Sequence, residues 1–302
     1  MINDTVADLQ SRFGGGNFTF FTAGGDLPAL RLSNDYGCAE ILLHGAHVTS
    51  YTPAGEVPVL WMSGKSLFAP GEAVRGGIPV CWPWFGPDPA GKFGGHGFAR
   101  VSEWRVVETT QSPAGKSSVT LELTEQDVDK KFAPQPFKLQ YTVTLGTALM
   151  AALKIFNTSD EVLNYSGALH SYFNVADASA LQIEGLNDCA YADKVLNVDA
   201  VQNGNVVIDR EIDRVYRNTS GIVRIIDPVF KRVIKVAKSG STSTVVWNPW
   251  VEKSKRMADF GDEEYHTMVC VEAANAAAAN DERSLVPGGM AELRQVISIE
   301  EN

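Results

Sequence analysis

The sequence predicts an all-β protein whose antiparallel strands form a sandwich or a barrel. Several segments alternate apolar and polar residues with a period of two, which is typical of half-buried strands. Gly, Pro, Asn, Asp and Ser separate these segments, as turns require. Helical patterns are few and short, so the crossover helices of a parallel sheet are not expected.

The candidate strands follow one another along most of the chain. Alternation is clearest in SSVTLELT (117–124) and FKLQYTVTLG (137–146). Further candidates lie at 38–44, 101–107, 149–157, 162–170, 222–227, 230–237, 244–248, 266–273 and 292–300. Short helices are possible at 8–13 and 124–132. Because no repeat, low-complexity tract or linker interrupts this pattern, we expect a single β domain over residues 1–302.

Composition and charge exclude several classes of protein. Of the 302 residues, 44% are hydrophobic and 21% charged, so the chain can bury a large core and general disorder is excluded. The net charge of -10 argues against a general nucleic-acid binder or a protein that binds anionic membranes. An anionic small ligand would therefore need a local cluster of Arg or Lys.

Other features point to the cytoplasm. No apolar stretch approaches the roughly 20 residues of a membrane-spanning helix, and the first residues lack the apolar region of a secretory signal. The four cysteines are scattered, without the paired spacing of a disulfide framework or a zinc site. We expect them to be buried or half-buried thiols.

A segment rich in Gly, Pro and aromatic residues, 70–100, breaks the strand pattern. A loop of this length in a compact domain is usually functional or disordered, and its five Trp and Phe residues argue against disorder. Arg75 and Arg100 flank it and could bind an anion, since guanidinium donors match phosphate and carboxylate oxygens. Alternatively, each Arg only ties the loop to a carboxylate.

Two residues are candidates for acid–base chemistry. His170 ends an apolar strand beside Tyr172 and Phe173, so it is either a core histidine or a general acid. Glu272 lies in the apolar run TMVCVEAAN, on the same strand face as Met268 and Cys270. A buried Glu is either ion-paired, to an Arg for example, or desolvated with a raised pKa suited to a base.

Other polar and aromatic residues carry weaker signals. His44 and His47 form an HGAH motif that is better explained by polar caps than by a metal site, and Asp193 and Asp213 are turn or salt-bridge candidates. The Lys253–Arg256 segment is a solvated loop or the edge of an anion site. Trp82, Trp84 and Trp250 could stack on a sugar, although each alone is more typical of a core. Motifs for a serine hydrolase, a zinc protease, a P-loop and a dinucleotide fold are absent, so no cofactor or metal is indicated.

Six blocks of this sequence together resemble the glucose-6-phosphate 1-epimerase family, the hexose-6-phosphate mutarotases related to aldose 1-epimerase. They come in the family's order: VRGGIPVCWPWFG (74–86), GHGFAR (95–100), ALHSYFNV (168–175), EIDRVY (211–216), VVWNPWVEKSKRMADF (245–260) and VCVEAAN (269–275). The resemblance implies a galactose-mutarotase-like β-supersandwich, with few short helices.

The resemblance also implies roles for individual residues. His170 and Glu272 match the catalytic pair, while Arg75, Arg100 and Asp213 match substrate-binding positions. The chain departs from many relatives at Gly95, where they have Gln. The contact that this Gln would make is then missing, or is supplied by Trp84 or His96.

The implied reaction is anomerisation of a hexose 6-phosphate without a cofactor or metal. Glu272 would remove the proton from O1, while His170 protonates ring oxygen O5. The ring opens, the C1–C2 bond rotates, and the ring closes on the other face. Arg75 and Arg100 would hold the phosphate.

Other functions stay open at this point. An aldose 1-epimerase would use a neutral hexose, and its two Arg would bind no phosphate. A non-catalytic sugar-phosphate binding protein would not need an acid–base pair, and a glycosidase would ordinarily use two carboxylates. We expect a small-molecule sugar phosphate as the ligand, no nucleic-acid or membrane partner, and a monomer, because no oligomer seam is evident.

Overall fold

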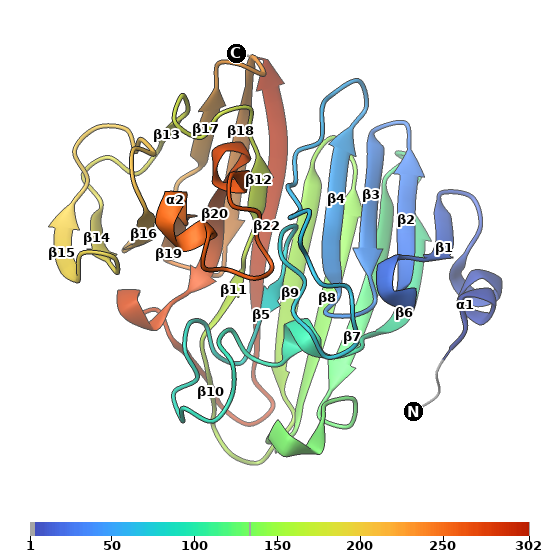
Figure 1. The fold of residues 1–302 in the computed structure, drawn as a ribbon. Coiled ribbons are helices and arrows are strands. Elements are labelled where there is room, and N and C mark those ends of the chain that lie inside the picture. The colour runs from blue at the N-terminus through green and yellow to red at the C-terminus, as the bar shows by residue number, and fades with distance from the viewer. Residues whose placement is uncertain (1–3, 133, 302) are drawn as a thin grey trace.

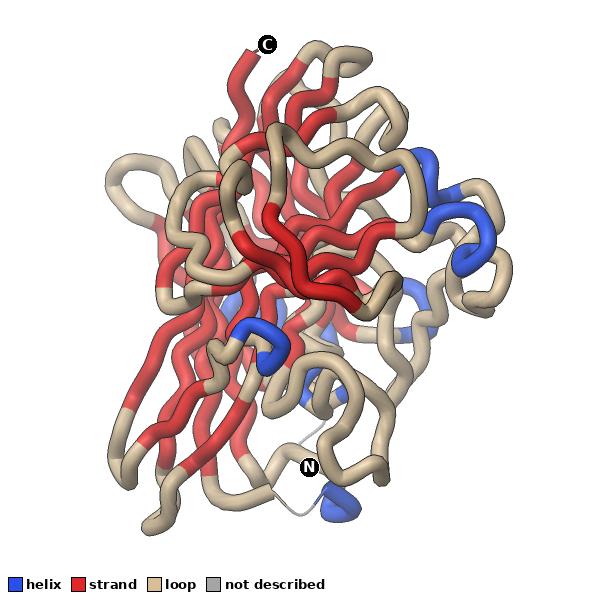
Figure 2. Tube along the Cα trace, turned by 90° about the vertical axis from the view of Figure 1, so that its left-hand side faces the viewer, coloured by secondary structure: helices blue, strands red, loops and turns tan. Residues whose placement is uncertain are grey.

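The protein, seen in a computed structural model, folds into antiparallel sheets stacked in layers (Figure 1). The structure describes residues 4–132 and 134–301. All strand pairs recorded in the described part are antiparallel, as the alternating sequence pattern predicted. The fold is therefore all-β, and Figure 2 shows how little of the chain is helical.

One eight-stranded sheet, the long sheet, is a continuous layer with one buried face. Its strands run in the order β13 (Gln182–Glu184), β17 (Val223–Asp227), β18 (Arg232–Ser239), β22 (Met290–Glu301), β9 (Leu149–Asn157), β8 (Phe137–Leu145), β7 (Ser117–Thr124) and β6 (Arg105–Gln111). Every second residue of β7 and β8 is buried, which matches the period of a strand with one face in the core.

A second eight-stranded sheet, the site sheet, carries the candidate site. Its strands run in the order β15 (Val198–Val201), β14 (Ala190–Asp193), β16 (Ile212–Tyr216), β19 (Ser243–Asn248), β20 (Met268–Asn275), β11 (Gly167–Leu169) and β5 (Val80–Cys81), and β12 (Tyr172–Asn174) also pairs with β20. Strands β19 and β20 are buried along their whole length. Both faces of this sheet are therefore covered, one by the core and the other by loops around the site.

The remaining elements are smaller. A four-stranded sheet contains β1 (Phe18–Thr22), β2 (Pro28–Asn34), β3 (Gly37–Leu42) and β4 (His47–Pro53), and a two-stranded sheet pairs β10 (Leu163–Tyr165) with β21 (Arg283–Leu285). The α-helices are α1 (Val6–Phe13) and α2 (Trp250–Ser254); short 3-10 turns lie at Gly24–Asp26, Ala99–Val101, Lys130–Phe132, Glu264–Thr267 and Ala277–Ala279. No helix in the described residues is long and apolar enough to cross a membrane.

Two sheets pack side by side on the long sheet. The four-stranded sheet contacts β7 and β8, and the site sheet contacts β18 and β22. The largest buried cluster fills the space between these layers. A second cluster lies on the other face of the site sheet, where it surrounds the candidate site.

Most sequence-based expectations agree with this fold. Each predicted strand overlaps an observed strand, and the predicted helix at 8–13 lies within α1. The short helix expected at 124–132 is wrong, because β7 runs through Thr124 and the Asp127 carboxylate accepts hydrogen bonds from the Thr124 amide and hydroxyl. Only Lys130–Phe132 form a 3-10 turn.

The loop at 70–100 has little regular structure but is held firmly. His44 Nε2 lies 2.7 Å from the Glu72 carbonyl oxygen, and His47 Nε2 lies 2.7 Å from that of Gly76. Within the loop, Trp82 is 1% exposed and packs against Phe98 and Phe137, so it is a core residue. The aromatic residues of this segment thus anchor it to the sandwich, as its composition predicted.

Candidate functional site

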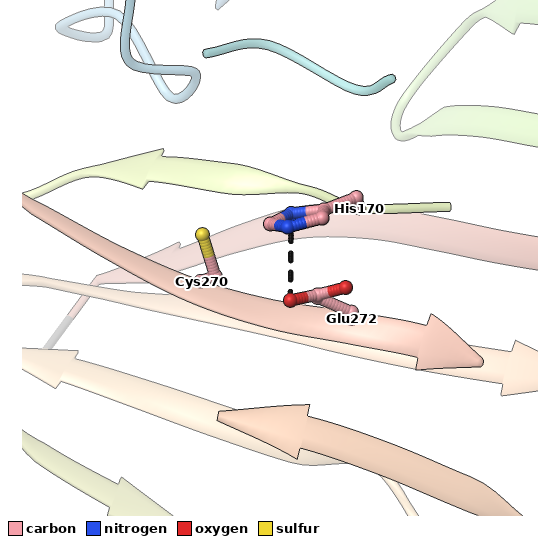
Figure 3. A group of neighbouring side chains, drawn as sticks. All are labelled: His170, Cys270 and Glu272. Atoms are coloured by element: carbon pink, nitrogen blue, oxygen red, sulfur yellow. Dashed lines mark ion pairs between the residues drawn. The ribbon is translucent and has the colours of Figure 1, made fainter. Parts of the chain in front are cut away.

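His170 and Glu272 face each other on the site sheet. His170 Nδ1 lies 3.4 Å from Glu272 Oε1, and the imidazole lies directly over the carboxylate (Figure 3). The side chain of Glu272 is 1% exposed and that of His170 is 10% exposed. His170 Nδ1 and Glu272 Oε2 have no hydrogen-bond partner among the described residues, so both can receive a ligand's hydrogen bonds.

Strand register explains why these two residues meet. Strand β11 pairs with β20 up to Leu169 opposite Ala273, and β12 continues with Tyr172 opposite Cys270. The register is unbroken between the two pairings, so His170 lies opposite Glu272 on the same face. Cross-strand neighbours of this kind lie about 5 Å apart at Cβ.

Burial favours the uncharged form of both groups. It raises the pKa of Glu272 well above its usual value, and the nearby Asp213 carboxylate adds to this effect. Burial also lowers the pKa of His170 well below its usual value, with contributions from His96, Arg75 and Arg100. The close contact is therefore best described as a neutral acid beside a neutral imidazole, because desolvation disfavours the alternative ion pair.

Aromatic rings form the walls around the pair. The imidazole of His170 stacks on the ring of Tyr172 at 4.7 Å between centroids, with an angle of 6°. Trp247 and Phe85 present their edges to His170, each with centroids 6.3 Å away. An apolar, flat-walled site with a few polar groups is typical of a small-molecule site.

Arg75 reaches the site from the loop at 70–100. Its guanidinium donates to the Tyr172 hydroxyl at 2.8 Å and forms an ion pair with Asp259 at 3.0 Å. These two partners hold its pKa above the usual value despite its burial. Arg75 thus ties the loop to a carboxylate, which is one of the two interpretations from the sequence, and its contact with Tyr172 places it beside the catalytic candidates; anion binding by Arg75 stays a prediction.

Arg100 and His96 also lie near His170. Arg100 donates to the Gly95 carbonyl at 2.8 Å, and its Nε is buried without a hydrogen-bond partner among the described residues. His96 lies 5.5 Å from His170 between ring centroids, and burial lowers its pKa to about 3. A Cβ at Gly95 would lie 3.0 Å from the Gly86 carbonyl oxygen, so a Gln there would need a small shift of the loop.

Acidic and basic groups edge the site on β16 and β19. Asp213 lies opposite Trp247 in the ladder, and burial raises its pKa while Lys194 and Lys253 oppose the rise. The charge of Lys194 also acts on Glu272 and His96. Lys253 lies over the Trp247 ring at 5.8 Å and pairs with Glu211 at 3.0 Å.

Some sequence candidates lie elsewhere. Trp84 stacks on Phe93 and donates its indole N–H to the Gly94 carbonyl, so it packs within the loop. Trp250 starts α2 and packs on Tyr265. Asp193 pairs with Arg214 at 3.3 Å and accepts turn hydrogen bonds, as expected of a salt-bridge or turn residue.

Sequence reasoning gave no site role to five residues at or near the site: Tyr172, Trp247, Phe85, Lys194 and Asp259. Strand alternation in 244–248 could have placed Trp247, because it puts Val245 and Trp247 on one face, as observed. No local pattern signals Lys194 or Asp259, which come close only through the fold. All four cysteines are free, two of them buried and two half-buried, as predicted.

Comparisons with known proteins agree with this geometry. The sequence model of the family described as "Aldose 1-epimerase" matches residues 28–298. A relative from Cenchrus ciliaris is 38% identical over 78% of this chain and 74% of its own length, and one from Escherichia coli is 37% identical over 79% and 80%. Both carry the name "Putative glucose-6-phosphate 1-epimerase".

Solved structures show the same fold. The crystal structure of a "putative mutarotase" from Salmonella typhimurium superposes with a TM-score of 0.86 at 31% identity, covering 94% of each chain. A galactose mutarotase-like protein from Clostridium acetobutylicum, at 16% identity and a TM-score of 0.73, shares the fold. The match extends over nearly the whole chain, and the chain therefore belongs to the aldose 1-epimerase family.

Proposed function

We propose that this protein interconverts the α and β anomers of a hexose 6-phosphate, with glucose 6-phosphate as the preferred substrate. The facing pair of His170 and Glu272 is the observation that carries the proposal. Anomerisation needs one group that takes the O1 proton and one that protonates O5. Membership of an epimerase family and the names of the relatives support an isomerase acting on a hexose phosphate.

One proton shared by the pair is sufficient for the cycle. A carboxylate with an imidazolium and a carboxylic acid with a neutral imidazole carry the same net charge. In our proposal the proton first passes from Glu272 to His170, then Glu272 takes the O1 proton while His170 gives its proton to O5, and ring closure on the other face reverses the last two transfers. Each transfer contributes about 10²–10⁴-fold to the rate. The surrounding rings of Tyr172, Trp247 and Phe85 exclude water from these steps.

Substrate positioning falls to the polar groups at the edge. Asp213 would accept hydrogen bonds from sugar hydroxyls, and Arg75 and Arg100 would hold the phosphate. The Nε of Arg100 supplies a donor without a protein partner, and Lys194 adds a positive charge. Of the two residues that could replace the contact of a Gln at position 95, His96 is a better candidate than Trp84. His96 lies beside His170, whereas Trp84 packs inside the loop.

A neutral hexose is the alternative substrate, and one contact favours it. Asp259 already offsets the charge of Arg75, which weakens the attraction of Arg75 for a phosphate. Exchange NMR on glucose 6-phosphate, galactose 6-phosphate and glucose separates the two. If the phosphate is bound, Arg100→Ala raises KM for glucose 6-phosphate about tenfold to 100-fold, the value of a charged hydrogen bond. Equal turnover of phosphorylated and free sugar would favour the neutral substrate.

Catalysis itself is tested by His170→Ala and Glu272→Gln in the same NMR assay. We expect each to lower kcat by about 10²–10⁴-fold. Glu108→Gln on the exposed face of β6 is the matched control and should keep full activity. Full activity of both site variants would refute the mechanism. The monomeric state, the single-domain organisation and the cytoplasmic location inferred from the sequence stay predictions.

A further inference from the structure

A thiol completes a group of three possible metal ligands at the proposed catalytic pair. One ligand atom each from His170, Cys270 and Glu272 lies within 4.8 Å of the other two, and all three residues are buried. Figure 3 shows Cys270 on the same face of β20 as Glu272, with its sulfur on the side of the imidazole. The acid–base mechanism gives this thiol no role.

The donor set and spacing suit a thiophilic divalent cation. Thiolate, imidazole and carboxylate are the common ligands of Zn²⁺, at about 2.0–2.3 Å, so tetrahedral ligand atoms lie roughly 3.3–3.7 Å apart. The 3.4 Å between His170 Nδ1 and Glu272 Oε1 lies in this range. To bind, the imidazole has to turn until its Nδ1 lone pair points at the cation, and the sulfur has to approach by about 1–1.5 Å at most. The unpaired Nδ1 of His170 and Oε2 of Glu272 are orphaned buried atoms that a cation would satisfy.

We propose that Zn²⁺ and similar cations bind to His170, Cys270 and Glu272 and thereby switch the epimerase off. On binding, the Cys270 thiol and the Glu272 carboxyl each release a proton to solvent, and the sulfur and a carboxylate oxygen form bonds to the metal, without any oxidation or reduction. Both groups of the acid–base pair then serve as ligands and cannot transfer protons to the sugar. The inhibitory part of this inference rests on the proposed function, whereas the binding part does not.

Cobalt binding tests the site without using activity. Co²⁺ added to the full-length protein should produce the near-ultraviolet absorption of a thiolate–cobalt bond. Cys270→Ser should abolish this absorption, while Cys81→Ser should keep it, because Cys81 is equally buried beside the site but lies outside the ligand group. No absorption in the wild type, or absorption that persists in Cys270→Ser, would overturn the proposal. Thermal melts show whether each variant is folded.

Zinc inhibition tests the consequence. Zn²⁺ should slow anomerisation reversibly, with a chelator restoring the rate. Loss of a residue that only hydrogen-bonds a metal ligand weakens metal binding about 10–100-fold, so loss of the sulfur ligand itself in Cys270→Ser should raise the inhibitory concentration of Zn²⁺ at least about tenfold. Equal inhibition of both proteins would refute the switch. If the wild type shows the Cys270-dependent absorption but no epimerase activity, the metal site stands and the proposed function fails.

A separate observation concerns Gln295, a fully buried amide in the core of the sandwich. It lies on β22 of the long sheet and crosses the core to the site sheet. The Ser171 hydroxyl donates to its Oε1, and its Nε2 donates to the Val271 carbonyl at 3.2 Å. Ser171 follows His170 directly, and Val271 precedes Glu272, so one side chain contacts both strands beside the pair.

Gln295 repairs a break in the ladder at this point. The Val271 amide donates to the Ser171 carbonyl at 3.3 Å, but the Ser171 amide donates back to the Leu169 carbonyl at 3.1 Å instead of across to Val271. The Gln295 side-chain amide replaces the Ser171 amide as the hydrogen-bond donor to the Val271 carbonyl. We infer that Gln295 is a positioning residue, which sets the separation of the two strands where His170 faces Glu272.

Steady-state kinetics distinguish positioning from mere stability. Gln295→Met keeps the length of the side chain and removes both hydrogen bonds. A misplacement of about 1 Å costs about 10²-fold, so kcat should fall about tenfold to 100-fold, KM should change little and the pH profile should shift. Asn157→Leu is the control, because Asn157 is another buried amide of the long sheet that bonds the Glu161 and Leu285 carbonyls away from the site. If both variants lose stability alike but keep kcat, Gln295 has only a structural role.

Discussion

Replacing Glu272 by Gln should inactivate the enzyme and stabilise the fold at the same time. The change keeps the shape of the side chain and removes its charge. In the wild type, burial raises the pKa of Glu272 well above its usual value, so the folded state binds this proton more tightly than the unfolded state does. The wild type is therefore destabilised as the pH rises from the unfolded pKa towards the folded pKa, and the variant lacks this penalty.

The magnitude follows from proton linkage. One proton taken up on folding costs about 1.4 kcal/mol of stability per pH unit between the two pKa values. Below the unfolded pKa of about 4.3, both proteins should respond to pH in the same way. Above it, the free energy of unfolding of Glu272→Gln should exceed that of the wild type by an amount that grows with pH.

Urea unfolding of both proteins over a series of pH values, from below the unfolded pKa of about 4.3 upwards, measures this difference. Exchange NMR on the same samples should show kcat lower by about 10²–10⁴-fold in the variant. Parallel stability curves would refute the reasoning, because Glu272 would then be as well solvated in the folded state as in the unfolded one. A variant that is less stable at high pH would instead indicate an ion pair with His170.

Three further predictions concern other parts of the fold. Burial lowers the pKa of His47 and of His96 to about 3, so the stability that each histidine contributes should be fully present above pH ~6.5 and be lost by up to about 1.4 kcal/mol per pH unit as the pH drops; a flat urea-stability profile in the Glu272→Gln variant, which lacks the opposing effect of Glu272, would contradict this. Trp82→Ala should cost about 3–5 kcal/mol in denaturant unfolding, because the ring is 1% exposed among other aromatics, and a cost near zero would argue against a core role. Gly97→Ala should destabilise the protein more than Gly86→Ala, although both glycines have a positive φ. Of these two, only Gly97 would bring a Cβ against a backbone atom, the Trp82 carbonyl oxygen at 2.0 Å, and equal melting temperatures of the two variants would contradict this clash.

Many of the strands could be read from the sequence, although the candidates did not include β1, β2, β4, β13, β14, β15 and β16. Alternation in 117–124 predicted β7 with its observed limits, and the further strand candidate at 149–157 has the limits of β9. The expectation that Cys270 and Glu272 share a face holds because side chains of a strand alternate with a period of two wherever the strand is placed. The short β5 and β12 were not predicted, because two- and three-residue strands carry no periodic signal.

Only the tertiary structure decided which groups meet. Sequence motifs nominated His170 and Glu272 separately, but their contact depends on a register between strands about a hundred residues apart, which no local pattern specifies. No local pattern specifies the ion pair between Asp259 and Arg75 either, nor the hydrogen bond by which Gln295 reaches the site sheet through the core. A side chain's face follows from its own strand, whereas its partners follow from how the sheets pair and pack.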